Sequence, residues 1–327
     1  MATHIATNIP GPVLSIVTTM YKSSGFVGSF YERITEVARK ITADYEIIFV
    51  NDGSPDSSVS LAVELSKIDP KICVIDLSRN FGHHQAILAG LRHARGNFAF
   101  LIDVDLEEQP EWLIDFWQEL HVSSADVVYG IQTARGGSLL KRHTGALFYK
   151  LFNLTSDTQV PENQCTVRLM NRSYLDAIIG FTEADVFLAG LFSWSGFSQR
   201  PLHVTKMNRS GKSTYTPVRL LRLFLNAITS FSAYPLTLIF FVGTCITLLS
   251  VTYAIGLLIK RLLEPDTVLS GFTSLMVSLW FIGGSIISIL GVIGIYVGKI
   301  FKETKSRPQY LVRSIYEQRP VGSALGQ

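Results

Sequence analysis

Two long stretches near the end of the chain carry no charged side chain, and they restrict the folds open to this sequence more than any other feature. Residues 236–259 and 267–298 contain neither Asp, Glu, Lys nor Arg. A bilayer core of roughly 30 Å needs about 20 apolar residues in a helix, whereas helices of globular proteins average about 11 to 12 residues. We therefore expect two transmembrane helices, at about 236–259 and 268–298, rather than two buried helices of a soluble domain.

The charges around these stretches indicate their orientation. The link at residues 260–266 carries two positive and two negative charges. The basic residues on the outer flanks are Arg219, Arg222, Lys299, Lys302, Lys305 and Arg307. The positive-inside rule then predicts a hairpin in the inner membrane with both ends of the chain in the cytoplasm. Small residues such as Gly243 and Gly291 favour close helix packing and a homo-oligomer.

The N-terminal part alternates short apolar runs with helical patterns. Strands are expected at residues 13–18, 46–50, 72–76, 98–102 and 126–129, and helices near residues 28–41, 57–67, 83–94 and 110–121. This βαβα order predicts an α/β fold whose mostly parallel sheet is covered by helices on both faces. Ligands bind such sheets outside the carboxyl ends of the strands.

Polar residues follow three of these predicted strands. Asn51 and Asp52 come after the second, Asn80 after the third, and Asp103 and Asp105 after the fourth. Mg²⁺ or Mn²⁺ takes oxygen ligands and often reaches a protein through one or two carboxylates plus substrate phosphates. The Asp-Val-Asp segment is therefore a candidate metal site for a nucleotide diphosphate; the alternative is a solvated turn with an Asp that caps a helix. No Gly-x-Gly-x-x-Gly motif follows the first strand, which disfavours a dinucleotide cofactor.

Charge and cysteine usage narrow the class further. A net charge of +3 on 327 residues is too small to indicate a nucleic-acid partner. The basic residues near the apolar stretches are better interpreted as facing anionic lipid headgroups. Cys73, Cys165 and Cys245 are scattered and odd in number, so they form neither a disulfide framework nor a metal-binding spacing, which fits a reducing cytoplasm.

Five segments carry a resemblance to a known family. They read EIIFVNDGS at 46–54, LSRNFG at 77–82, DVDL at 103–106, VRLM at 167–170 and SFSAYPL at 230–236. In this order the chain resembles the polyprenyl-phosphate glycosyltransferases of glycosyltransferase family 2. That group has the GT-A (Rossmann-like) fold and includes dolichyl-phosphate mannose synthase and bacterial enzymes that load a sugar onto undecaprenyl phosphate.

The resemblance implies an order of domains. A cytoplasmic GT-A catalytic domain would occupy residues 1–214, the two transmembrane helices residues 234–300, and a cytoplasmic tail residues 301–327. Between domain and hairpin, residues 215–233 mix bases with apolar side chains. They are expected to form an amphipathic helix on the membrane surface, the alternative being a helix packed on the domain.

The resemblance also implies roles for residues at the donor site. Asp52 would accept a hydrogen bond from the nucleotide base; the alternative is a turn residue in an Asp-Gly pair. Asp103 would contact ribose or metal-bound water, and Asp105 would bind the metal. Glu107, where the family usually has Gln, would be a further ligand or else a solvated residue at a helix start. Nucleotide contacts are also expected from Thr19, Tyr21, Asn51 and Asn80.

The implied reaction is attack of a lipid phosphate oxygen on the anomeric carbon of a nucleotide sugar, with inversion. Because a phosphate monoester is largely dianionic at neutral pH, the site must mainly neutralise phosphate charge, and Arg168 joins Asp103 and Asp105 as a catalytic candidate. The candidates for binding the acceptor phosphate, each of which could instead be a solvated residue, are Arg135, Lys141, Arg142, Arg209, Lys212 and Ser213.

Several positions depart from the family pattern. Thr166 stands where an Asp often precedes Phe-Arg, so no catalytic base is assigned there. Lys22 and Ser23 replace an Asn-Glu pair, which leaves the contacts of that turn open. His83 and His84, at a predicted helix start, are interpreted as structural or acceptor-side residues rather than as metal ligands.

The sequence thus predicts a metal-dependent transferase that makes a polyprenyl-phosphate-linked monosaccharide, with a UDP-sugar favoured over a GDP-sugar by resemblance. Two alternatives remain. One is a membrane polysaccharide synthase, which the single hairpin and the missing Gln-x-x-Arg-Trp motif disfavour. The other is a non-catalytic membrane subunit that binds a nucleotide sugar.

Overall fold

The computed structural model describes residues 12–132, 153, 159–183, 186–206, 234–263 and 272–318. The strands are β1 (Leu14–Met20), β2 (Tyr45–Asn51), β3 (Ile72–Leu77), β4 (Phe98–Leu101), β5 (Val127–Gln132), β6 (Gln164–Asn171), β7 (Gln199–Val204) and β8 (Val312–Glu317). The helices are α1 (Val27–Ile41), α2 (Ser58–Ile68), α3 (His83–His93), α4 (Trp112–Ser123), α6 (Arg172–Ile179), α7 (Leu188–Trp194), α9 (Tyr234–Leu263) and α10 (Phe272–Thr304).

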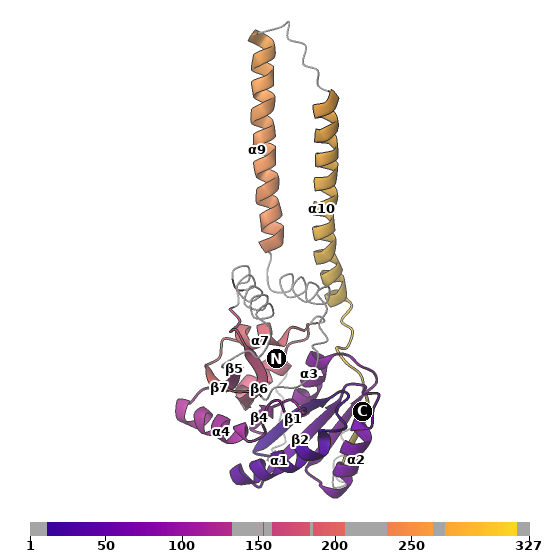
Figure 1. The fold of residues 1–327 in the computed structure, drawn as a ribbon, viewed down its shortest axis with the longest axis vertical. Coiled ribbons are helices and arrows are strands. Elements are labelled where there is room, and N and C mark those ends of the chain that lie inside the picture. The colour runs from indigo at the N-terminus through magenta and orange to yellow at the C-terminus, as the bar shows by residue number, and fades with distance from the viewer. Residues whose placement is uncertain are drawn as a thin grey trace, which may run out of the picture. The chain divides into compact units, whose positions relative to one another are not determined.

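The strands form one sheet in the order β7-β5-β6-β4-β1-β2-β3-β8 (Figure 1). β1 pairs in parallel with β2 and β4, β2 with β3, and β5 with β7. β6 is antiparallel to both β4 and β5, and β8 is antiparallel to β3. Only β6 and β8 therefore run against the other strands, which confirms the mostly parallel α/β sheet predicted from the sequence.

Side chains on the two faces of the sheet pack against two layers of helices. Leu14, Ile16 and Met20 of β1 belong to a core cluster that includes Phe30 and Ile34 of α1. On the opposite face α3 lies directly on β1 and β2, because a Cβ at Gly90 would stand 2.4 Å from Val17 Cγ1 and 2.9 Å from Val50 Cγ2. This close approach brings the first residues of α3 to the carboxyl edge of the sheet.

The order of the strands creates a switch point at that edge. From β1 the chain continues to β2 and β3 on one side, and then places β4 on the other side of β1. The loops that leave β1 and β4 therefore diverge, and ligands of open α/β sheets bind in such a crevice.

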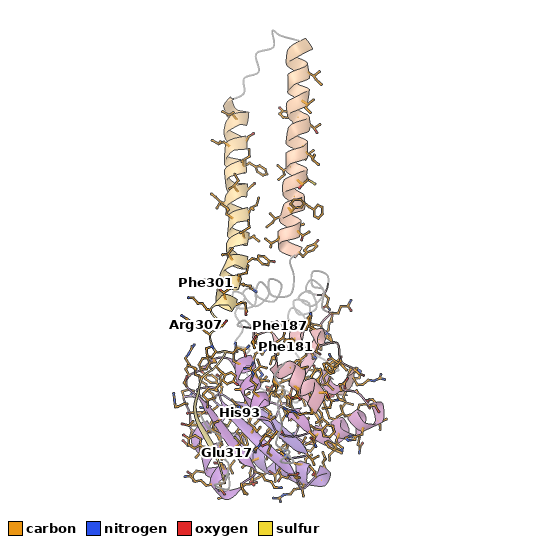
Figure 2. All side chains as sticks on the ribbon, turned by 180° about the vertical axis from the view of Figure 1, so that it is seen from behind. His93, Phe181, Phe187, Phe301, Arg307 and Glu317 are labelled. Carbon is orange, nitrogen blue, oxygen red and sulfur yellow. The ribbon has the colours of Figure 1, made fainter. Side chains whose placement is uncertain are left out.

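The segment predicted as a cytoplasmic tail, residues 301–327, contains regular structure in its described part. α10 continues to Thr304, and β8 then pairs with β3 through a register that includes Ile75↔Ile315. Arg313 donates from Nη2 to Ser78 O at 2.6 Å. Glu317, which is labelled in Figure 2, has a carboxylate oxygen 3.9 Å from Arg95 Nη1. The described residues from Pro308 to Gln318 belong to the same unit as the sheet. The prediction missed them because six residues with one edge partner leave no clear alternation in the sequence.

The helices α9 and α10 form a second unit. In the described part of the chain, one helical segment, Phe281–Thr304, is long and apolar enough to cross a membrane. Phe301 in this segment is 56% exposed, and its side chain projects away from the helix in Figure 2. In α9 the apolar segment is the shorter Leu236–Ile246. A second span at about 236–259 therefore stays a prediction.

Candidate functional site

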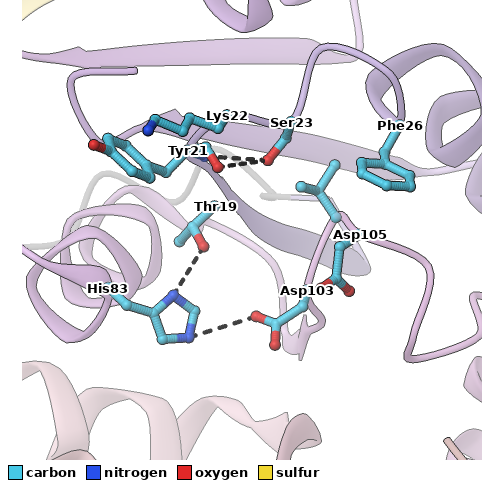
Figure 3. Close-up of a pocket in the computed structure, with 9 residues that line it drawn as sticks. Thr19, Tyr21, Lys22, Ser23, Phe26, His83, Asp103 and Asp105 are labelled. Atoms are coloured by element: carbon cyan, nitrogen blue, oxygen red, sulfur yellow. Dashed lines mark hydrogen bonds and ion pairs between the residues drawn. The ribbon is translucent and has the colours of Figure 1, made fainter. Parts of the chain in front are cut away.

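A pocket of about 190 Å³ opens at the carboxyl ends of β1 and β4 (Figure 3). Four of the predicted site residues, Thr19, Tyr21, Asp103 and Asp105, line it together. The other lining residues are Lys22, Ser23, Phe26, His83 and Val104. The pocket thus lies at the edge of the sheet where the rule for parallel strands predicts a ligand.

The turn after β1 is held by the loop after β2. Lys22 has a φ of 55°, a left-handed conformation that is uncommon outside glycine. Its N–H donates to Ser54 Oγ at 2.7 Å, and the N–H of Ser23 donates to Ser58 Oγ at 3.0 Å. These bonds fix the wall of the pocket at which Tyr21 is 47% exposed.

Asp103 lies opposite His83, as Figure 3 shows. His83 Nε2 is 3.5 Å from Asp103 Oδ1, and His83 Nδ1 is 3.2 Å from Thr19 Oγ1. Burial raises the pKa of Asp103 to about 6; the charge of Lys206 and a hydrogen bond with the Thr166 side chain oppose this, whereas Asp105 adds to it. Burial also lowers the pKa of His83, against the pull of nearby carboxylates. His83 thus belongs to the pocket and not only to the helix start.

The loop that carries Asp105 is tightly turned. Leu106 has a φ of 61°, and the N–H of Glu107 donates to Asp105 Oδ1 at 3.1 Å. Left-handed non-glycine residues cluster at functional sites. Glu107 is not among the residues that line the pocket, so its role as a metal ligand stays a prediction.

The two aspartates suit a hard divalent cation. In the described part of the chain, no three His, Cys, Asp or Glu side chains converge to hold a metal by themselves. Mg²⁺ commonly uses only one or two carboxylates and completes its shell with water and substrate phosphates. Asp103 is 24% exposed in its side chain and faces the same pocket as Asp105. The donor set therefore fits the expected Mg²⁺ or Mn²⁺.

Asn51 and Asp52 support loops rather than line the pocket. Asp52 accepts the N–H groups of Phe81 at 2.7 Å and Gly82 at 3.1 Å, and burial raises its pKa while these bonds oppose the shift. Asn51 donates to Asp76 Oδ1 at 2.7 Å. Asn80 is exposed on the next loop. Contacts of these three residues with a nucleotide stay predictions.

Arg168 is buried in β6 and is not among the residues that line the pocket. It donates to the carbonyl oxygens of Thr166 at 3.1 Å and Cys165 at 3.2 Å, and its guanidinium carbon stands 3.4 Å from the centroid of the Phe192 ring. Burial lowers its pKa to about 10. These contacts give Arg168 a packing role, and its catalytic role stays a prediction.

The acceptor-phosphate candidates and the interfacial segment 215–233 lie outside the described residues. Those candidates are Arg135, Lys141, Arg142, Arg209, Lys212 and Ser213.

Comparison with known proteins identifies the family. The profile of glycosyl transferase family 2 matches residues 15–179. A putative glycosyltransferase of Mycobacterium tuberculosis is 44% identical over 303 residues, which cover 93% of this chain and 88% of the relative. The bactoprenol glucosyl transferase of Shigella phage SfX is 34% identical over 306 residues, covering 92% of this chain and 99% of the relative. The chain belongs to glycosyl transferase family 2.

This finding confirms the resemblance drawn from the sequence motifs and makes the protein a glycosyltransferase with a GT-A-like domain. Among solved structures, mannosyl-3-phosphoglycerate synthase from Rubrobacter xylanophilus is 16% identical, with a TM-score of 0.43 over 66% of this chain and 72% of that chain.

Sequence reasoning missed two residues that lie beside Asp103, namely Glu108 and Lys206. Glu108 is fully buried, and its Oε1 lies 2.9 Å from Lys206 Nζ. The same carboxylate accepts the N–H of Asp103 at 3.4 Å and that of Thr166 at 3.1 Å. Burial and the Asp103 charge raise the pKa of Glu108, and Glu108 keeps Lys206 charged by raising its pKa. The only signal was a second Glu after the Asp-Val-Asp segment, and nothing in the sequence pairs it with Lys206.

Proposed function

We propose that this glycosyltransferase transfers a monosaccharide from a nucleotide sugar to a polyprenyl phosphate, with Mg²⁺ or Mn²⁺ bound. The observation that carries the proposal is the placement of Asp103 and Asp105 in one pocket at the switch point of the sheet. Relatives named bactoprenol glucosyl transferase, 33–34% identical over almost their whole length, support a polyprenyl acceptor.

A UDP-sugar is the proposed donor, and glucose is the first sugar to test because those relatives are named as glucosyl transferases. Asp103 and Asp105 would hold the cation, which neutralises charge on the leaving diphosphate. Tyr21 and Thr19 would line the space beside the nucleotide. The turn of Lys22 and Ser23, fixed by Ser54 and Ser58, would keep this wall in place.

In the proposed reaction a phosphate oxygen of the lipid forms a bond to the anomeric carbon, the bond from that carbon to the diphosphate breaks, and a nucleoside diphosphate leaves. This single displacement would invert the anomeric configuration. A dianionic phosphate needs no strong base for the attack. Its charge would be balanced by cations of the acceptor segments, for which Arg135, Lys141, Arg142, Arg209 and Lys212 remain the candidates, while Ser213 would donate a hydrogen bond to the phosphate.

The acceptor also gives α9 and α10 a role. We propose that both cross the inner membrane as a hairpin, with the sheet domain in the cytoplasm and residues 215–233 at the membrane surface. The charge-free stretches in both helices support this arrangement. The polar end of a polyprenyl phosphate would then be presented at the same face of the membrane as the donor.

A donor panel tests the proposal. Detergent-purified full-length protein is incubated with undecaprenyl phosphate, Mn²⁺ or Mg²⁺, and a set of UDP- and GDP-sugars, while nucleotide release and lipid mass are followed. We expect one donor to give a lipid-linked monosaccharide, and chelation of the metal to stop its formation. A polymer as product would favour a polysaccharide synthase. Metal-dependent donor binding without any lipid product would favour a non-catalytic subunit.

A further inference from the structure

A buried ion pair lies next to the two aspartates of the pocket. Glu108 has no exposed side-chain surface, and Lys206 retains 21%. Their charged atoms are 2.9 Å apart. Burying a carboxylate costs free energy unless the carboxylate is paired and hydrogen-bonded. The ion pair with Lys206 therefore keeps the Glu108 charge inside the fold.

The Glu108 carboxylate joins three segments that are distant in sequence. It accepts the N–H of Asp103 in the loop after β4 and the N–H of Thr166 at the start of β6. Lys206, just beyond the end of β7, supplies the third contact. Glu108 therefore fixes the main chain of the loop that carries Asp103 and Asp105.

Thr166 completes the arrangement. Its side chain makes a hydrogen bond with Asp103, while its backbone N–H bonds to Glu108. Glu108 thus holds the main chain of Asp103, and Thr166 holds the Asp103 side chain. Asp103 Oδ1 lies 3.5 Å from His83 Nε2. Groups that orient ligating carboxylates in this way tune metal affinity, although they do not touch the metal.

We infer that Glu108 and Lys206 are a positioning pair that orients Asp103 and Asp105 toward the metal-bound diphosphate of the donor. The inference rests on the proposed function. Lys206 keeps the Glu108 carboxylate in place, and Glu108 passes that constraint to the Asp103 amide. Neither residue lines the pocket, so both act through Asp103 and not by contact with substrate.

Metal binding, measured apart from turnover, tests the pair. Full-length protein in detergent is titrated with Mn²⁺ in the presence of the nucleoside diphosphate that the donor panel releases, UDP being the one expected, and free Mn²⁺ is followed by electron paramagnetic resonance. Glu108→Gln and Lys206→Met should each raise the Kd for Mn²⁺ by about 10- to 100-fold, the usual effect of removing a group that orients a metal ligand. The conservative Lys206→Arg should restore most of the affinity.

The double variant and a matched control sharpen the test. Because the two residues act as one unit, Glu108→Gln combined with Lys206→Met should be no weaker in Mn²⁺ binding than the weaker single variant. The double variant also removes both charges, so it serves if Lys206→Met alone fails to fold. Glu111→Gln makes the same chemical change three residues along, at an exposed pair with Arg33, and should leave the Kd unchanged.

Two results would overturn this inference and leave the proposed function standing. One is a wild-type Kd for Mn²⁺ in folded Glu108→Gln and in the double variant. The other is a rise confined to the KM for the lipid phosphate. The second result would make Lys206 an acceptor-binding residue. If the wild-type protein binds no Mn²⁺ in the presence of either UDP or GDP, the proposed metal-dependent function fails, and the inference fails with it.

Discussion

His83 Nε2 lies 3.5 Å from Asp103 Oδ1, and the other nitrogen of the same ring lies 3.2 Å from Thr19 Oγ1. The imidazole therefore links the end of β1 to the loop after β4 across the pocket (Figure 3).

Loss of this ring should impair the site. We expect His83→Ala to lower kcat/KM for the donor by about 10- to 100-fold, as for other groups that orient a ligating carboxylate, whereas His83→Gln should retain more activity because its amide can still bond to Asp103. His93→Gln on the same helix is the control, since the His93 ring bonds to the carbonyl of Ala89 one turn earlier in α3 and does not line the pocket. Equal kinetics for His83→Ala and wild type would contradict this role.

Asp105→Ala should abolish turnover and leave the fold intact. Asp105 lines the pocket and is only partly buried, so its side chain is not part of the hydrophobic core. We expect a loss of at least about 100-fold in kcat, the scale for removing one preorganised electrostatic group. Circular dichroism and Tm should match the wild type. Asp115→Ala, an exposed change on α4, is the control. Full activity of Asp105→Ala with metal still required would exclude Asp105 as the ligand.

Gly53 should tolerate no side chain. It has a φ of 61°, and a Cβ there would lie 2.4 Å from both Arg79 C and Asn80 N. Gly53→Ala should therefore cost about 2 kcal/mol or more in the free energy of unfolding, from the left-handed backbone and the clash together. Gly25→Ala, where a Cβ meets nothing within 4 Å, should change the stability little. Denaturant unfolding measures both, and similar midpoints would contradict the prediction.

The sheet and its functional edge could be predicted because both follow from local patterns. The apolar run at 98–102 and the aspartates after it identify a strand end and place Asp103 and Asp105 at the carboxyl edge of the sheet, whereas Thr19 and Tyr21 were expected from the family resemblance. No tertiary knowledge was needed for that step.

What the sequence could not give depends on pairing between distant segments. β8 joins β3 across most of the chain, and Glu108 meets Lys206 only because the fold brings the loop after β4 to the segment after β7. His83 and His84 look alike in sequence, yet His83 faces the pocket while His84 Nδ1 bonds to the Val186 carbonyl at 3.0 Å. Such roles are set by the fold and not by residue type.

Asp56 should make the protein more stable at neutral than at acidic pH. Burial raises its pKa, but hydrogen bonds from Ser54 Oγ and Ser58 Oγ at 2.6 Å and from the Ser24 N–H at 3.0 Å outweigh burial and hold the pKa well below its usual range. A carboxyl whose pKa is lower in the folded state stabilises the fold above its unfolded pKa of about 3.9, and loses that contribution as the pH falls below it.

The corresponding experiment compares Tm between pH 7 and pH 2. Asp56→Asn should cost about 1–2 kcal/mol at pH 7, the scale for losing a side chain that caps a helix start, and the gap to wild type should shrink below pH 4. Glu64→Gln, which breaks an exposed pair with Lys67, should show no such pH-dependent gap. A gap of constant size down to pH 2 would contradict the assigned bonds.

Removal of β8 should destabilise the sheet domain although it lies at the end of the described chain. Truncation after Arg307 deletes the ladder to β3 and the bonds of Arg313 to Asp76 and Ser78. A loss of about 2 kcal/mol would lower Tm by about 4–8 °C for a domain of this size, and the freed edge of β3 would promote aggregation. Truncation after Gln318 retains β8 and is the matched control. If both truncated proteins melt together and stay equally soluble, β8 contributes nothing to the stability of the domain.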